Sequence, residues 1–181
     1  LKTFNQKVLV VLNRYEFDTE EEIDFMRKWC NKKDAAFAVN DAFVKGGEGG
    51  REMAEAVIEI CKDPSPPLNF TYNQEDDVET KIRKIVTKIY GGKDVVLYKK
   101  AQENIKKIKK LGLEHLPICM AKTQYSFTDE AAVSGLDGDF KIDVEDLVIN
   151  KGAGFIVAVC GEMMRMPGLP KVPQANFIDV V

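Results

Sequence analysis

The residues best suited to chemistry form a glycine-rich loop, "DAFVKGGEGG", at positions 41–50. This loop matches neither standard phosphate-binding template. The P-loop pattern G-x-x-x-x-G-K-[ST] places its lysine after the glycines, whereas Lys45 precedes them here. The dinucleotide pattern G-x-G-x-x-G would begin at Gly47 and Gly49, and it requires a third glycine where the chain has Glu52. The loop therefore predicts a backbone that a flat ligand or an anion can approach closely, or else a plain tight turn between a strand and a helix.

Two aromatic residues follow the ends of two apolar runs. Tyr15 comes after the run 7–13, and Phe43 comes after the run 35–40. The carboxyl ends of neighbouring parallel strands border the ligand crevice of an α/β sheet, so these two rings could clamp a planar ligand. The same pattern also fits two core residues at the rim of the sheet.

Other residue combinations predict no catalytic centre and no metal site. There is no Ser/His/Asp, Cys/His or paired-carboxylate arrangement, and the single histidine, His115, has no ligand at metal-binding spacing, so we interpret it as structural. None of the four cysteines forms a CxxC pair, and each lies in an apolar pattern. We interpret them as reduced thiols in the core, which favours a cytoplasmic protein. The four are Cys30, Cys61, Cys119 and Cys160.

Two charged or polar segments have open interpretations. The loop "MAKTQYS" (120–126) follows a predicted strand and is typical of a binding or domain-contact loop, or of a solvated one. Six lysines between positions 99 and 110 predict a solvated helix face. A nucleic-acid surface is disfavoured because the whole chain of 181 residues has a net charge of -3.

The apolar patterns predict an α/β fold, a layered sheet with helices on both faces. Residues 1–66 read as a Rossmann-like lobe with β-α-β-α order, and the prolines between 63 and 70 separate it from a second, smaller α/β lobe, residues 67–181, with a C-terminal strand pair. The strands of the first lobe read as buried on both faces. The expected helices and strands of the second lobe are 78–92, 94–98, 99–112, 116–122, 140–149 and 154–161.

Further local patterns refine this picture. Thr19 and Glu22 have capping-box spacing at the start of the first helix. In the strand 140–149 the alternation of apolar and polar residues breaks near Asp146, so the pattern does not define its inner face. The segment 137–139 predicts a turn, and the tail 166–174 predicts an extended, packed loop. The apolar stripe of the first helix is expected to comprise Ile23, Phe25, Met26, Trp29 and Cys30.

Membrane association is disfavoured. The longest apolar runs, 8–12 and 155–160, are far shorter than the ~20 residues of a membrane span, and the start of the chain lacks the apolar segment of a signal peptide. The chain begins at Leu1 and enters a strand almost at once, which we interpret as a cut inside a longer protein; removal of an initial methionine by processing is the alternative.

Several long motifs together resemble the formate–tetrahydrofolate ligases, also called 10-formyltetrahydrofolate synthetases. They are "VKGGEGG" (44–50), "LPICMAKTQYS" (116–126) and "GAGFIVAVCGEMMRMPGLPKVPQA" (152–175). The segments "LNRYEFDTEEE" (12–22) and "KIVTKIYGGKDV" (84–95) fall in the same order, and "IDVV" (178–181) resembles the C-terminus of the family. The resemblance covers essentially the whole chain but only about the last third of a family member.

This resemblance implies an activity for the parent protein. The family makes 10-formyltetrahydrofolate from formate, tetrahydrofolate and ATP, releasing ADP and phosphate, with Mg²⁺ and a monovalent cation, and the reaction is thought to pass through formyl phosphate. Its P-loop lies in the N-terminal part. The resemblance therefore implies a C-terminal fragment without catalytic residues or a metal site, inactive alone, whose partner is the N-terminal domain of the same chain in a homo-oligomer.

The resemblance also implies site residues. The ring-binding positions of the family fall on Tyr15, Phe43 and Val39, and its pocket loop falls on Lys45, Gly46, Gly47 and Glu48. This chain has Tyr15-Glu16 where the family commonly has Phe-Pro, and Phe43 where it commonly has Trp. Stacking should survive both changes because the rings stay flat. The alternatives are a stand-alone module that binds a mononucleotide or another flat ligand, and a lobe that mainly builds the oligomer.

Overall fold

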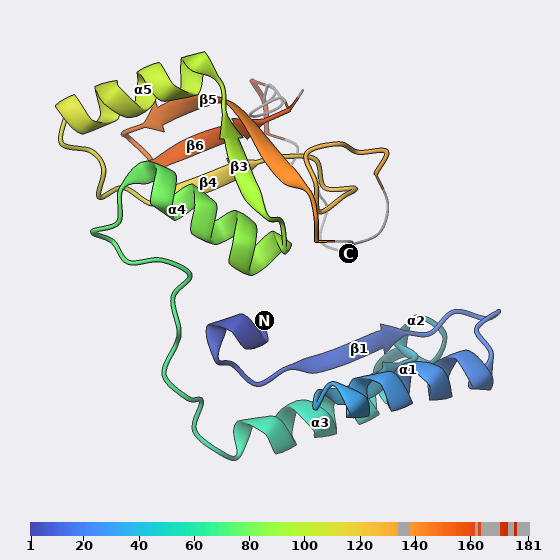
Figure 1. The fold of residues 1–181 in the computed structure, drawn as a ribbon. Helices are drawn as coiled ribbons and strands as arrows, with labels where there is room; N and C mark the ends of the chain where they lie inside the picture. The colour runs from blue at the N-terminus through green and yellow to red at the C-terminus, as the bar shows by residue number, and fades with distance from the viewer. Residues whose placement is uncertain (134–137, 162, 164–170, 174–175, 177–181) are drawn as a thin grey trace. The chain divides into compact units, whose positions relative to one another are not determined.

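The computed structural model describes residues 1–133, 138–161, 163, 171–173 and 176 (Figure 1). The chain divides into two compact units, Leu1–Phe70 and Thr71–Val181, of which the second is the longer. The predicted α/β class is confirmed, because both units combine helices with parallel strand pairs. Within the described part, no helix is long and apolar enough to cross a membrane.

The first unit has the predicted β-α-β-α order, with short helical turns added. Strands β1 and β2 pair in parallel, with Leu9 opposite Ala36 and Asn13 opposite Asn40. The strands are joined through α1, and a helical turn, α2, with a 3-10 segment, η2, leads from β2 into α3. In chain order the elements are η1 Lys2–Phe4, β1 Leu9–Asn13, α1 Glu20–Lys32, β2 Ala36–Asn40, α2 Ala42–Lys45, η2 Gly46–Gly50 and α3 Arg51–Cys61.

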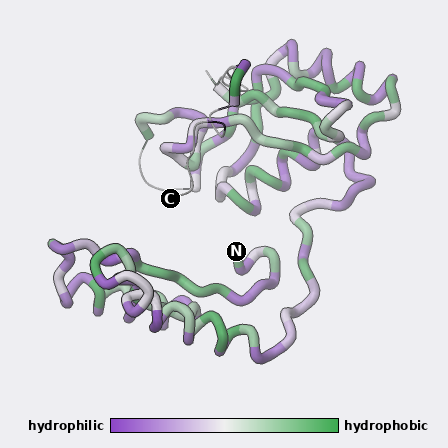
Figure 2. Tube along the Cα trace, turned by 180° about the vertical axis from the view of Figure 1, so that it is seen from behind, coloured by the Kyte–Doolittle hydropathy of each residue, from purple (hydrophilic) through white to green (hydrophobic). Residues whose placement is uncertain are grey.

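The apolar run of β1, hydrophobic along most of its length in Figure 2, is half-buried rather than buried as predicted. The reason is that this sheet has only two strands, whereas strands buried on both faces belong to wider parallel sheets. In α3, all of whose residues are described, no side chain is fully buried either. The buried apolar residues of the first unit are Ile23, Cys30 and Ala38.

Helix α1 begins where the capping box was predicted. The Thr19 side chain accepts a hydrogen bond from the Glu22 backbone N–H, and the Glu22 carboxylate accepts one from the Thr19 N–H at 2.9 Å. The prediction that Phe25 and Trp29 widen the buried stripe is wrong, because they are 66% and 46% exposed. At 3.6 residues per turn they lie about 200° and 240° around the helix from Ile23, on the opposite face.

The second unit is a four-stranded sheet with helices. Its strand order is β3-β5-β6-β4, and the β5–β6 pair is antiparallel whereas β3–β5 and β4–β6 are parallel. Consecutive residues Ile156, Val157 and Ala158 of β6 are all buried, so this strand is covered on both faces. The elements are α4 Val78–Ile85 with a π-helical turn Val86–Tyr90, β3 Asp94–Leu97, α5 Lys99–Lys110, β4 Ile118–Ala121, β5 Lys141–Asn150 and β6 Phe155–Cys160.

The broken alternation in β5 reflects a β-bulge. The register with β6 shifts between Val144 and Asp146. Ile142 and Val144 are buried before the shift and Leu147 after it, so the buried positions change parity at the bulge. The predicted strand pair is therefore confirmed, and the bulge explains why its inner face could not be assigned.

Helix α5 presents its lysines to solvent, as predicted, while Ala101 and Ile108 are buried against the sheet. The cysteine prediction holds for Cys30 and Cys160, which are buried, and is wrong for Cys61 and Cys119, which are exposed. Cys61 ends α3, and Cys119 lies in β4 at the edge of its sheet.

Parts of three sequence motifs lie outside the described residues. The tail prediction for 166–174 has only 171–173 described, and the closing segment 178–181 is outside altogether. The turn predicted at 137–139 has its first residue outside the described part.

Candidate functional site

The candidate site lies where β1 and β2 end. Both strands finish on an asparagine, and these two residues, Asn13 and Asn40, are opposite each other in the register. The Asn40 side-chain Nδ2 donates a hydrogen bond to Asn13 Oδ1 at 2.9 Å, and the backbone N–H of Arg14 donates to the Asn40 carbonyl at 2.9 Å. The two loops that carry the candidate aromatics therefore begin at strand ends that are hydrogen-bonded to each other. They lie at the carboxyl edge of the sheet, where parallel α/β sheets bind ligands.

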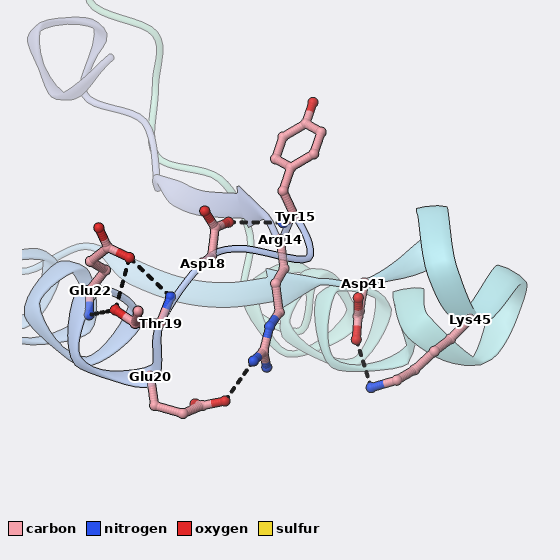
Figure 3. A network of polar contacts seen from close by, with 8 residues as sticks. All are labelled: Arg14, Tyr15, Asp18, Thr19, Glu20, Glu22, Asp41 and Lys45. Atoms are coloured by element: carbon pink, nitrogen blue, oxygen red, sulfur yellow. Dashed lines mark hydrogen bonds and ion pairs between the residues drawn. The ribbon is translucent and has the colours of Figure 1, made fainter.

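The first loop is closed by an aspartate. The Tyr15 N–H donates to the Asp18 carboxylate at 2.8 Å, and the Asp18 N–H donates to the Tyr15 carbonyl at 3.1 Å. An ion pair of 2.7 Å between Arg14 and Glu20 ties the loop to the first turn of α1. The Tyr15 ring points away from this network and is 64% exposed (Figure 3).

The second loop is closed by another aspartate. The Asp41 carbonyl accepts hydrogen bonds from the N–H groups of Val44 and Lys45, which form the single turn of α2. The Asp41 carboxylate also makes an ion pair of 2.6 Å with the Lys45 ammonium (Figure 3). Phe43 lies in the middle of this turn and is 88% exposed. Neither Phe43 nor Tyr15 belongs to the buried core of the first unit.

The glycines of the loop have distinct roles. Gly46 has φ 58° and ψ -144°, a conformation that is essentially restricted to glycine. Gly49 accepts a hydrogen bond from the Asp41 N–H at 2.9 Å, and a Cβ at Gly49 would lie 2.3 Å from the Asp41 carbonyl carbon and oxygen. At Gly47, by contrast, a Cβ would meet no described atom within 4 Å. The second loop thus needs glycine at two positions to fold back onto its own start.

Carboxylates fix the outer edge of β2. Glu52 stands where the dinucleotide template requires a glycine, and its Oε1 accepts a hydrogen bond from the Val39 N–H at 3.2 Å. Glu52 also lies 3.7 Å from a guanidinium nitrogen of Arg27. Val39, a predicted pocket wall, is half-buried in the strand, and the Glu48 carboxylate lies 3.7 Å from the Arg51 guanidinium. Glu52, which replaces the glycine of the dinucleotide pattern, therefore has a structural role in holding β2.

Tyr15 and Phe43 lie after the ends of β1 and β2, as the sequence predicted, whereas the residues that fix their loops were not predicted. Asn13 and Asn40 join the loops, while Asp18 and Asp41 close them. One signal was present in the sequence, because both apolar runs end in an asparagine that is followed by polar residues. The need for glycine at position 49 had no such signal, since it depends on a contact eight residues away.

The loop "MAKTQYS" in the second unit is organised around its lysine. The Lys122 ammonium donates hydrogen bonds to the carbonyls of Thr123 and Ser126 and lies 5.0 Å from the centre of the Tyr90 ring. Burial lowers the pKa of Lys122 below its usual value. A cavity of about 380 Å³ borders this loop, lined in part by Met120 and Phe127. The loop is therefore stabilised by internal hydrogen bonds, and the Lys122 ammonium donates to carbonyls of the same loop.

His115 makes a local contact with the backbone. The Nδ1 atom of His115 lies 3.1 Å from the Gly112 carbonyl, a local contact in keeping with a structural role. Among the residues that the structure describes, no three His, Cys, Asp or Glu side chains gather as metal ligands.

Comparisons with known proteins point to one family. The model of the formate–tetrahydrofolate ligase family matches residues 1–181. The chain is 46% identical over 182 residues to the formate–tetrahydrofolate ligase of Parabacteroides distasonis, covering 100% of this chain and 33% of that protein. It is 51% identical over 172 residues to that of Campylobacter concisus and 53% identical over 172 residues to that of Campylobacter curvus, covering 95% of this chain and 31% of each relative. The chain thus spans about a third of the length of the curated relatives it matches.

Proposed function

The chain belongs to the formate–tetrahydrofolate ligase family, and we propose that it is the C-terminal part of a ligase that makes 10-formyltetrahydrofolate from formate, tetrahydrofolate and ATP. ADP and phosphate are the other products, and the parent enzyme serves one-carbon metabolism. In this proposal the chain supplies the pocket for the folate or nucleotide ring.

One observation carries the proposal. Tyr15 and Phe43 follow the ends of two register-paired strands, and both rings are exposed although the backbone around them is hydrogen-bonded. A solvent-exposed aromatic ring can stack on a planar ligand. When the turn that carries the ring is already fixed by hydrogen bonds, its backbone loses little conformational freedom on binding. We assign the two rings to a clamp, with Val39 and the loop residues Lys45, Gly46, Gly47 and Glu48 as its surroundings.

The phosphoryl chemistry is assigned to the rest of the parent protein. Activating formate with ATP requires cations that converge on the transferred phosphate. This sequence has no G-x-x-x-x-G-K-[ST] motif, and the ammonium of Lys45 is bound to Asp41. We therefore propose that ATP phosphates, Mg²⁺ and the monovalent cation are held by the N-terminal domain of the same polypeptide, and that this chain has no activity alone.

Two further parts of the proposal concern the parent enzyme as a whole. We place it in the cytoplasm, because the four cysteines, all in the described part of the chain, are free thiols. We also propose that it is a homo-oligomer, as the family resemblance implies.

Calorimetric titration with tetrahydrofolate tests the pocket. The wild-type chain should bind, and a Tyr15→Ala/Phe43→Ala double variant should bind at least about fivefold more weakly, since each stacked ring is expected to contribute about 0.5–1.5 kcal/mol. Phe25→Ala is the matched control, because Phe25 is another exposed aromatic of the first unit, on α1. Equal affinities for all three proteins would refute the clamp.

A turnover assay tests the division of labour. Formate, ATP and tetrahydrofolate are mixed with the chain, and 10-formyltetrahydrofolate is measured. We expect none, and its formation by this chain would overturn the assignment of catalysis to the N-terminal domain. Binding of a mononucleotide without binding of tetrahydrofolate would instead support the stand-alone nucleotide module.

A further inference from the structure

We propose that Asn40 is a positioning residue, which together with Asn13 sets the spacing between the Tyr15 and Phe43 loops. This inference rests on the proposed ring pocket. It assigns no direct ligand contact to either asparagine. Their role is to hold the two loops at one separation, so that a planar ligand meets both rings at once.

The side chain of Asn40 makes two bonds that bridge different parts of the site. Its Nδ2 donates to Asn13 Oδ1 at 2.9 Å, across the two strands. Its Oδ1 accepts a hydrogen bond of 3.3 Å from the N–H of Ala42, the first residue of α2 and the neighbour of Phe43. An amide is the side-chain group that offers a donor and an acceptor from one rigid plane, so neither aspartate nor leucine can reproduce both bonds.

The direction of the bridge follows from this geometry. The N–H of Ala42 needs an acceptor, which makes the atom facing it the oxygen of Asn40 and leaves the nitrogen to donate to Asn13. Asn13 therefore has to provide only an acceptor. Position 40 therefore requires a side chain with both a donor and an acceptor, whereas position 13 requires an acceptor alone. Substitutions at the two positions can test this difference.

The remaining backbone between the bridge and each ring is also fixed. The Arg14 N–H donates to the Asn40 carbonyl, and the next residue, Tyr15, is held by Asp18. On the other side, the Asp41 carbonyl holds the turn that carries Phe43, and Figure 3 shows Asp41 and Tyr15 on these neighbouring loops. A change in the distance between Asn13 and Asn40 would therefore move both rings, because the backbone between the asparagines and each ring is held by hydrogen bonds.

The test compares three substitutions by titration with tetrahydrofolate. Asn40→Asp removes the donor and places a carboxylate oxygen against Asn13 Oδ1, so the affinity should fall about fivefold or more, because a ligand that no longer meets both rings at once loses much of their stacking. Asn13→Asp keeps the acceptor and should bind within about twofold of wild type, because a carboxylate accepts from Nδ2 as an amide oxygen does. Asn13→Ala breaks the same bridge from the other strand and should weaken binding like Asn40→Asp. It gives an independent result if Asn40→Asp does not fold.

Comparing ligand affinity with thermal stability in these variants distinguishes a positioning role from a purely structural one. A residue with a structural role alone would change the midpoint of thermal unfolding without changing the affinity measured well below that midpoint. Wild-type affinity for folded Asn40→Asp and Asn13→Ala would overturn this inference. If wild type binds and Phe43→Ala weakens binding, the ring pocket stands even when the asparagine inference falls. If wild type does not bind, the proposed pocket and this inference both fall.

Discussion

Replacing Gly49 by alanine should disturb the loop that carries Phe43 far more than the same change at Gly47. A Cβ at Gly49 would lie 2.3 Å from the carbonyl carbon and oxygen of Asp41 and 2.7 Å from the backbone nitrogen of Ala42, all of them backbone atoms that cannot rotate away. The loop must therefore open, which breaks the bond of 2.9 Å from the Asp41 N–H to the Gly49 carbonyl.

The magnitude follows from these two effects. Overpacking costs about 1–3 kcal/mol, and the lost hydrogen bond contributes about 0.5–1.5 kcal/mol, so the first unit should lose roughly 1.5–4.5 kcal/mol of unfolding free energy. At Gly47 the new methyl group meets no described atom within 4 Å, and the change should stay within about 1 kcal/mol.

Urea unfolding followed by circular dichroism measures both variants, and titration with tetrahydrofolate measures the pocket. We expect Gly49→Ala to lower both stability and affinity, and Gly47→Ala to leave stability near wild type. Equal stability of the two variants would show that the loop does not fold back on Asp41 as described, which would refute the reasoning.

Three further predictions rest on single contacts. Tyr15→Phe should bind tetrahydrofolate as wild type does, because stacking needs the ring and not the hydroxyl, and Tyr15→Ala should bind about 2- to 13-fold more weakly. Calorimetry giving the same affinity for both variants would contradict this. Thr19→Ala should cost about 1 kcal/mol of stability in thermal unfolding. The cap also has a pH dependence, because hydrogen bonds from the backbone N–H and the hydroxyl of Thr19 lower the pKa of Glu22. The contribution of Glu22 to stability is therefore present above the usual carboxyl pKa and is lost as the pH falls below it. This loss should be smaller in Thr19→Ala, which lacks the hydroxyl donor but keeps the backbone N–H. Burial raises the pKa of the Cys160 thiol to about 12, from 9.0, so stability should be constant below pH 9 and fall as the pH rises from 9 towards 12, by roughly 1.4 kcal/mol at pH 10. Cys160→Ala should lack this part of the decline, and parallel pH profiles for the two proteins would contradict the assignment.

Local signals in the sequence predicted much of the fold. The capping box at Thr19 and the apolar runs that became β1 and β2 depend on neighbouring residues, and the structure contains them where expected. What the patterns could not predict depends on distant partners. The bulge at Val144 and Asp146 appears only when β5 is paired with β6. Lys81, fully buried with its ammonium bound to the carbonyls of Glu114 and Leu116, had no local signal at all.

In the candidate site, too, local features were predicted from the sequence and features that depend on distant partners were not. The positions of Tyr15 and Phe43 after strand ends follow from sequence order, because parallel strands place their carboxyl ends at one edge. The error at Phe25 and Trp29 came from counting apolar residues without their angle around the helix. The bridge between Asn13 and Asn40 requires the strand register, which no single strand reveals.

The central claim is that this chain holds a planar ring between Tyr15 and Phe43. Nuclear Overhauser measurements on the chain with bound tetrahydrofolate test it most directly, with the aromatic protons assigned through Tyr15→Ala and Phe43→Ala. We predict cross-peaks from the protons of the bound pterin ring to the rings of both residues. Cross-peaks to other aromatics instead, such as Tyr125 and Phe127 beside the cavity of the second unit, would contradict the account.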